Sequence, residues 1–360
     1  MISMRELLTE VVKREASDLH ITPGAPPMFR IDGKLVKSRY EVVTPETSKR
    51  LAYSIMTEKQ KQKFEENWEA DLSFGIEGLS RFRTNIFLQQ GLVAMALRRV
   101  PTVIKGIEEL RLPKIIGTFT DYPKGLILVT GPTGTGKSTT LAALIDKINT
   151  EKHLHILTVE DPIEFVHKHK SSIVNQREVY SDTKTFATAL KYAMREDPDV
   201  VMIGEMRDLE TIGAALTIAE TGHLTFATLH TNSCAETINR IIDVFPPAQQ
   251  TQVRVQLSFV LRAIVTQQLI PMIGGGRIVA TEILITIPAI RAQIREDKIH
   301  QIYSTMQAGQ KYGMQTMNMS IAELYLRGII SLEEAYAHSF DPTELNDLII
   351  RKKERVSRGA

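Results

Sequence analysis

The spacing of apolar residues changes several times along the first hundred positions of this chain. Residues 1–16 follow a helical period, and residues 17–36 form short β-like pieces separated by Pro-Gly and Asp-Gly turns. A charged stretch over residues 44–68 again follows a helical period. Residues 71–101 then alternate between apolar and polar positions in three runs, which is typical of an antiparallel meander. The pattern predicts a small α+β domain over residues 1–100.

The second of these alternating runs carries two arginines on its polar face. One side of the run comprises Phe82, Thr84, Ile86 and Leu88, and the other side comprises Arg81, Arg83 and Asn85. The pattern therefore predicts a basic strand that faces outward. On this pattern alone, a solvated polar face is the plainer explanation of both arginines.

The rest of the chain has the pattern of an α/β domain. Residues 101–123 hold repeated proline and glycine breakers, so we expect a linker there. Beyond it, helical stretches alternate with β-like runs at residues 126–130, 156–159, 200–203, 224–229 and 278–286. This order predicts a largely parallel, covered sheet over residues 124–360, with its ligand at the carboxyl ends of the strands. Beyond Pro288 the chain turns helical, and we expect the basic residues 351–360 to form a frayed tail.

The composition narrows the class of protein. The chain has 360 residues, which suits two domains, and its 43% hydrophobic and 24% charged content is that of a globular protein. A net charge of +2, without a basic stripe interleaved with aromatic residues, argues against a nucleic-acid partner. Cys234 is the only cysteine, which excludes an internal disulfide and a cysteine-based zinc site. No apolar run is long enough to span a bilayer and the start lacks a signal-peptide core, so we expect a cytoplasmic chain without direct membrane insertion.

A glycine-rich loop predicts that the chain binds a nucleoside triphosphate. The loop follows the apolar run 126–130 and precedes a helical segment, with the spacing G-x-x-x-x-G-K-S. Such a loop turns its main-chain N–H groups around phosphate oxygens, next to a helix N-terminus. Lys137 would reach the β- and γ-phosphates, and Ser138 would offer its hydroxyl to Mg²⁺. The predicted nucleotide-binding residues are Gly131, Pro132, Thr133, Gly134, Thr135, Gly136, Lys137, Ser138 and Thr139.

Two acidic clusters come at the ends of later β-like runs. Glu160, Asp161 and Glu164 follow the run at 156–159, and one of these carboxylates would orient or deprotonate the attacking water. The run at 200–203 is followed by Gly204 and Glu205. In related NTPases an acid at this place holds magnesium, and because Gly204 stands where an aspartate is usual, Glu205 would take that role.

Two histidines flank the run at 224–229. If the run is extended, seven residues separate His223 from His230 by about 23 Å, so they cannot both touch one phosphate of the same subunit. His230, at the carboxyl end, is the better γ-phosphate sensor. His223 is either structural or serves a neighbouring subunit.

The motifs together resemble a known family. GPTGTGKST, TVEDPIEFVH, REDPDVVMIGEMRD and TGHLTFATLHT occur in the order of the Walker A, Asp box, Walker B and His box of the secretion ATPase superfamily. The segment 289–296, AIRAQIRE, is similar to the AIRNLIRE motif of the PilT family of type IV pilus retraction motors, from which it departs at Ala292 and Gln293. The resemblance implies a PAS-like domain over residues 1–100 and a RecA-like ATPase domain over residues 124–360.

The resemblance also implies an activity and an assembly. Members form homohexamers that hydrolyse ATP with Mg²⁺ to drive pilus retraction, acting with a platform protein at the cytoplasmic face of the inner membrane. Arg81 and Arg83 match the arginines that complete the nucleotide site, while Arg195 and Arg207 are weaker candidates for subunit contacts. The remaining catalytic candidates are Glu164 as first choice of general base, Glu205 as the alternative base and the magnesium ligand beside Ser138, Glu160, and His230.

Other functions remain open on the sequence. The chain could be a pilus-assembly or type II secretion ATPase, although it has no four-cysteine zinc site. It could also be an accessory retraction paralogue, or a scaffold that binds nucleotide without hydrolysing it.

Overall fold

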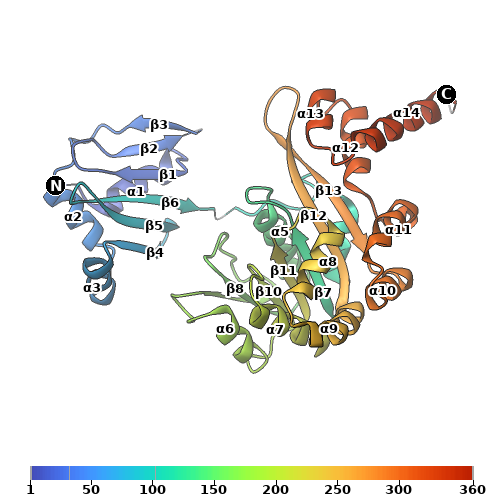
Figure 1. Cartoon of the computed structure of the whole chain (residues 1–360). Helices are drawn as coiled ribbons and strands as arrows, with labels where there is room; N and C mark the ends of the chain where they lie inside the picture. Colours follow the sequence, from blue (N-terminus) through green and yellow to red (C-terminus); the bar gives the residue numbers. More distant parts are fainter. Residues whose placement is uncertain (1, 32, 102, 359–360) are drawn as a thin grey trace. The chain divides into compact units, whose positions relative to one another are not determined.

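The computed structural model describes residues 2–31, 33–101 and 103–358, which form two compact units (Figure 1). Unit 1 comprises Met1–Val103 together with Glu164–Val166, and unit 2 comprises Ile104–Ile163 and His167–Ala360.

Unit 1 is an antiparallel sheet covered by three helices. Its elements are α1 (Met4–Lys13), β1 (Asp18–Ile21), β2 (Met28–Ile31), β3 (Lys34–Lys37), α2 (Pro45–Tyr53), α3 (Glu58–Asn67), β4 (Glu69–Ile76), β5 (Ser80–Gln89) and β6 (Leu92–Val100). The strand order is β3-β2-β1-β6-β5-β4. Leu7 and Leu8 of α1, Leu51 of α2 and Phe64 of α3 share one core with the sheet. The α+β prediction for this part of the chain is confirmed.

The predicted meander is β4, β5 and β6, whose neighbouring strands pair antiparallel. Along β5, Phe82, Thr84 and Ile86 are buried, whereas Arg81 and Arg83 are partly exposed. The predicted two-sided strand is therefore confirmed. The likeness of this unit to a PAS domain stays a prediction.

The helical stretch expected over residues 44–68 is two helices. α2 ends at Tyr53, and α3 begins after Thr57. Thr57 Oγ1 accepts the main-chain N–H of Gln60, and the Gln60 side chain accepts the main-chain N–H of Thr57. This reciprocal cap begins a new helix, which the helical period alone did not reveal.

Unit 2 is a mixed α/β fold around a largely parallel sheet. Its elements up to the last strand are α4 (Lys114–Gly117), η1 (Thr118–Asp121), β7 (Gly125–Thr130), α5 (Lys137–Glu151), β8 (His155–Glu160), β9 (Ile173–Glu178), α6 (Phe186–Ala193), β10 (Val200–Ile203), α7 (Leu209–Glu220), β11 (Leu224–Leu229), α8 (Cys234–Asp243), α9 (Pro247–Val260), β12 (Leu261–Pro271) and β13 (Arg277–Ile285). The strand order is β13-β12-β7-β11-β10-β8-β9, in which β13 pairs antiparallel with β12 and the other neighbours pair parallel. The predicted fold class is confirmed, while β9 and β12 were not expected.

Both faces of this sheet are buried, as the apolar runs predicted. Alternate residues of β7 enter different cores: Leu126 and Leu128 pack with α7, α8 and α9, whereas Ile127 and Val129 pack with α5. Leu112, Ile116 and Phe119 join the second core. A sheet covered in this way leaves its strand ends as the place where polar groups can gather.

The C-terminal part is helical, as predicted. It comprises α10 (Pro288–Arg295), η2 (Ile299–Gln301), α11 (Ile302–Ala308), η3 (Gln310–Tyr312), α12 (Met317–Leu326), α13 (Leu332–Ala337) and α14 (Pro342–Arg358). Helices α12, α13 and α14, drawn in red in Figure 1, share a small core with one end of the β12–β13 hairpin.

The expectation of a frayed tail was wrong for residues 351–358, which continue α14. Arginine, lysine and glutamate are good helix formers, so a stretch without an apolar face can still extend an established helix. Lys352 Nζ also lies 2.8 Å from Glu323 Oε2 of α12. Residues 359–360 lie outside the described part of the chain.

Candidate functional site

The glycine-rich loop joins β7 to α5, as the sequence predicted. Gly131 has φ 137°, and a Cβ atom there would lie 2.5 Å from the main-chain oxygen of Gln267 on the neighbouring strand β12. Only glycine fits this close approach of two backbones. The loop therefore takes its shape partly from β12, more than a hundred residues further along the chain.

Lys137 begins α5 and folds back over the loop. Its Nζ donates to the main-chain oxygens of Gly131 at 2.8 Å and Pro132 at 3.1 Å. Burial lowers the pKa of Lys137, and the negative charge of Glu205 works in the opposite direction. The ammonium thus lies inside the loop, where phosphate oxygens could replace the two carbonyl oxygens as its acceptors.

Glu205 lies at the carboxyl end of the sheet together with His230. It follows β10, and His230 follows the adjacent strand β11. His230 Nε2 lies 3.2 Å from Glu205 Oε1. Because parallel neighbours end at the same edge, two residues distant in sequence meet there.

Arg207 is the second partner of Glu205. Its Nε lies 2.7 Å from Glu205 Oε1, and its Nη2 donates to Oε2 at 2.7 Å. Burial alone would raise the pKa of Glu205, but the hydrogen bond from Arg207 and the charges of His230 and Arg207 hold that pKa below its usual value. Glu205 is therefore a carboxylate at neutral pH, paired with side chains that can move.

Gly204 explains the departure from the usual acidic motif. A Cβ atom at this position would lie 3.2 Å from Glu160 Cα and 3.3 Å from the main-chain oxygen of Val159. An aspartate here would require the main chain at the end of β8 to shift slightly. The close packing of these two strand ends favours glycine and leaves Glu205 as the acid that follows β10.

Glu160 is buried at the end of β8, with 6% of its surface exposed. Its Oε1 accepts hydrogen bonds from Thr158 Oγ1 at 2.7 Å and from Gln176 Nε2 at 3.0 Å. Two donors on one oxygen hold the carboxylate in a defined orientation.

Arg81, Arg83 and Glu164 belong to unit 1. Arg81 Nε donates to Ser73 Oγ of the neighbouring strand β4 at 2.8 Å. Arg83 Nη1 lies 3.0 Å from Glu164 Oε1. Their proposed catalytic roles stay predictions.

His223 lies at the opposite end of β11 from His230, as the spacing predicted. Its Nδ1 is 3.0 Å from the main-chain oxygen of Ile218 and 3.2 Å from Thr221 Oγ1. These partners belong to the end of α7 and the turn after it. Within this chain, His223 ties that turn to the start of β11.

The sequence does not point to two residues near these site residues, Arg207 beside Glu205 and Gln267 beside the loop. The sequence suggests Arg207 only as a subunit contact, although its position two residues after Glu205 is a signal that could place it at this acid. Gln267 is buried in β12, and its Nε2 donates to Thr140 Oγ1 of α5 at 2.8 Å. No pattern in the sequence links positions so far apart.

The residues at the loop fit a magnesium ion that is brought by phosphates. The Ser138 hydroxyl and the Glu205 carboxylate are hard oxygen donors, the type that Mg²⁺ prefers. Among the described residues, no group of three or more His, Cys, Asp or Glu side chains is arranged to hold a metal ion by itself. This agrees with the usual case, in which Mg²⁺ is held by one or two protein oxygens together with nucleotide phosphates.

None of the helices in the described part of the chain is long and apolar enough to span a membrane.

Known proteins resemble the chain over nearly its whole length. The family described as "Type II/IV secretion system protein" matches residues 1–275. The type IV pilus retraction ATPase PilT of Pseudomonas aeruginosa is 50% identical over 334 residues, which covers 93% of this chain and 97% of the relative. The type IV pilus ATPase PilU of the same organism is 40% identical over 349 residues, covering 97% and 91% of the two chains.

A solved structure agrees with these matches. A crystal structure of the pilus retraction motor PilT with bound ADP superposes with a TM-score of 0.91 and 53% identity, covering 96% of this chain and 100% of that chain. The chain therefore belongs to the type II/IV secretion system family and, within it, to the PilT group of ATPases.

Proposed function

We propose that this chain is an ATPase that drives type IV pilus retraction. The observation that supports the chemistry is the contact between Glu205 and His230 at the strand ends. The negative charge of Glu205 also favours the charged form of Lys137 in the phosphate loop. The pilus as its target is supported by the likeness to PilT over almost the full chain.

ATP would bind with its phosphates in the loop of residues 131–139. The main-chain N–H groups of this loop and the N-terminus of α5 attract the anion. Lys137 would leave the oxygens of Gly131 and Pro132 and bind the β- and γ-phosphates. Ser138 and Glu205 would hold Mg²⁺, which neutralises charge on the phosphate oxygens.

Glu164 stays our first choice of general base for the attacking water, with Glu205, the proposed magnesium residue, as the alternative. Glu205 is ionised by its surroundings and follows the strand beside His230, which would sense the γ-phosphate. Comparing Glu205→Gln with Glu164→Gln separates the two assignments. The base variant loses single-turnover hydrolysis while it still binds ATP, and the other variant keeps measurable hydrolysis.

The likeness to PilT supports further proposals about assembly. We propose a homohexamer with a PAS-like domain at residues 1–100, a linker at 101–123 and the ATPase domain at 124–360. Arg81 or Arg83 would stabilise charge on the γ-phosphate, an effect worth about 10³- to 10⁵-fold in rate for finger arginines. The motor would act in the cytoplasm at the inner membrane, through a platform protein of the pilus.

A deletion strain tests the output of the motor. Loss of a retraction motor leaves cells with abundant pili that do not retract, and bald cells would contradict retraction in favour of assembly. Purified protein tests the chemistry separately, because a nucleotide-dependent scaffold would show no Mg²⁺-dependent ATP turnover in any oligomeric state.

A second candidate is an accessory retraction ATPase, because the chain is also 40% identical, over 97% of its length, to a second type IV pilus ATPase, PilU. If this is correct, the deletion strain still retracts its pili, but with less force or at a lower rate. The higher identity to PilT favours the main motor.

A further inference from the structure

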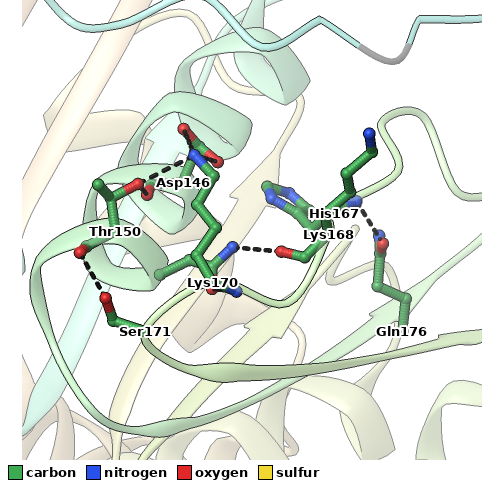
Figure 2. Close-up of polar contacts among 8 residues, drawn as sticks. Asp146, Thr150, His167, Lys168, Lys170, Ser171 and Gln176 are labelled. Atoms are coloured by element: carbon green, nitrogen blue, oxygen red, sulfur yellow. Dashed lines mark hydrogen bonds and ion pairs between the residues drawn. The ribbon is translucent and has the colours of Figure 1, made fainter.

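Strand β9 holds the base of the segment that carries Glu164. The chain leaves unit 2 after Ile163 and returns to it at His167. The main-chain N–H of Ile163 donates to Glu178 Oε2 at 3.2 Å. Figure 2 shows the second bond, in which the main-chain N–H of His167 donates to Gln176 Oε1 at 2.7 Å. Residues two apart on a strand point to the same face. Gln176 and Glu178 therefore lie on one face of β9 and bind the two ends of the segment, at His167 and Ile163 respectively.

The other end of the Gln176 side chain binds Glu160. Gln176 Nε2 donates to Glu160 Oε1 at 3.0 Å. The amide cannot be reversed, because its NH₂ group would then face the N–H of His167 and its carbonyl oxygen would face the Glu160 carboxylate. The main chain at His167 thus decides which end of Gln176 meets Glu160.

His167 is in turn followed by residues tied to the helix of the phosphate loop. Asn149 Nδ2 donates to the main-chain oxygen of Lys168 at 2.7 Å, and Asn149 Oδ1 accepts the N–H of Lys170 at 3.2 Å. Lys170 Nζ also lies 2.7 Å from Asp146 (Figure 2). Both Asn149 and Asp146 belong to α5, which begins at Lys137. The return of the chain is therefore anchored to the element that holds the phosphates.

We propose that Gln176 is a positioning residue for ATP hydrolysis. By bonding both Glu160 and the main chain at His167, it orients the Glu160 carboxylate and fixes the point at which the Glu164 segment returns to unit 2. The proposal rests on the ATPase function proposed above. Gln176 acts on the reaction through Glu160, and its hydrogen bonds to Glu160 and His167 do not involve the phosphate loop. Its loss should therefore lower kcat and leave the KM for ATP nearly unchanged.

The Gln176→Glu variant distinguishes a positioning role from a merely structural one, because only a positioning role predicts a pH-dependent change in kcat. The carboxylate of this variant can still accept the N–H of His167, but its second oxygen would lie about 3 Å from Glu160 Oε1. Two carboxylates this close cannot both be ionised, so one pKa of the pair rises. Below that pKa the protonated acid of the variant donates an O–H to Glu160 in place of the amide N–H. Above it the bond is replaced by repulsion.

The readout is the kcat of the full-length protein from pH 6 to pH 9, relative to wild type. We expect Gln176→Glu to be near wild type at pH 6 and to fall by about tenfold or more toward pH 9. Gln176→Leu has no donor at any pH, so its kcat should be low throughout, with an unchanged KM.

Asn175→Asp is the matched control on the same strand. Asn175 Nδ2 lies 2.9 Å from His155 Nε2, and alternation along β9 places Asn175 on the opposite face from Gln176. The same amide-to-acid change there should leave the ratio to wild type constant across the pH range.

The outcomes separate this proposal from the ATPase function itself. A wild-type protein without ATP turnover contradicts the proposed function. If wild type is active, a Gln176→Glu ratio that is flat with pH, or a Gln176→Leu kcat within about twofold of wild type, overturns the positioning role. Melting temperatures of all variants with and without ATP check folding and binding, and a Gln176→Leu protein that no longer gains stability from ATP would also overturn it.

Discussion

The two edges of the parallel sheet in unit 2 carry similar residues but connect them differently. At the carboxyl edge, where β7, β8, β10 and β11 end, Glu205 pairs with the side chains of Arg207 and His230. At the amino edge, where the same strands begin, Asp199 Oδ2 accepts the main-chain N–H of His155 at 2.8 Å. His155 Nδ1 lies 3.0 Å from the main-chain oxygen of Asp197.

The difference shows that the presence of acids and histidines at a strand end does not by itself identify a nucleotide site. At the amino edge, Asp199 and His155 form hydrogen bonds with main-chain atoms, so the fold itself supplies their partners. At the carboxyl edge, the partners of Glu205 are side chains, which a nucleotide can displace. A glycine loop and the N-terminus of α5 lie only at the carboxyl edge, so anion chemistry is expected there.

The largest effect on ATP turnover is expected when a lysine at each edge is replaced by alanine and the two variants are compared. Lys137→Ala removes the cation of the phosphate loop, and we expect ATP turnover to fall by about 10³-fold or more. Lys152, at the amino edge, donates to the main-chain oxygen of Thr120 and lies 3.6 Å from Asp121. Lys152→Ala should keep turnover within about twofold of wild type. A steady-state ATPase assay compares both, and equal losses would refute the distinction between the edges.

The acids provide the next test. Glu205→Gln keeps the shape of the side chain but removes the charge for magnesium and water, and turnover should fall by about 10²- to 10³-fold. Asp199→Asn makes the same change at the amino edge, where it weakens a bond to His155 and should lower the free energy of unfolding by about 1 kcal/mol. Its turnover should be unchanged. ATPase rates and thermal melting, measured on the same samples, decide the matter.

The connection from the carboxyl edge of β8 to the amino edge of β9 contains a titratable group. His167 is 7% exposed, and burial lowers its pKa to about 4, while Asp146 raises it and Lys170 lowers it. Because the folded-state pKa lies below the unfolded value of about 6.5, His167 destabilises the fold as pH falls from about 6.5 toward 4. At pH 5 the loss would be about 2 kcal/mol.

His167→Leu should therefore lose less thermal stability than wild type between pH 7.5 and pH 5. The main-chain bond of His167 to Gln176 is kept in this variant, so activity at pH 7.5 gives the control. If the melting temperatures of both proteins fall equally between pH 7.5 and pH 5, His167 is not the group that destabilises the fold at low pH.

The smallest effect on turnover is expected away from both edges, on α10. Ile290 and Ile294 are fully buried, and Arg291 and Arg295 lie on another side of this helix. Replacing both arginines by alanine should leave ATPase activity within about twofold and stop pilus retraction. If turnover falls as far as in Glu205→Gln, α10 belongs to the catalytic machinery and not to an output surface.

The sequence predicted most of what depends on neighbouring residues. The phosphate loop is contiguous, and its flanking strand and helix follow from apolar spacing. The two-sided strand β5 and the opposite positions of His223 and His230 also follow from a local period. The capped break at Thr57 and the helical residues 351–358 were missed, because caps and established helices override average polarity.

The partners of the site residues were decided only by the tertiary structure. Hydrophobic burial on both faces of the sheet brings strand ends together, and this process is not encoded at any single position. It places His230 beside Glu205, the main-chain oxygen of Gln267 against Gly131, and Gln176 beside Glu160. The sequence by itself determined that the chain holds phosphates and carries acids in the right order. The fold determined which of those acids face the phosphate loop and what holds them there.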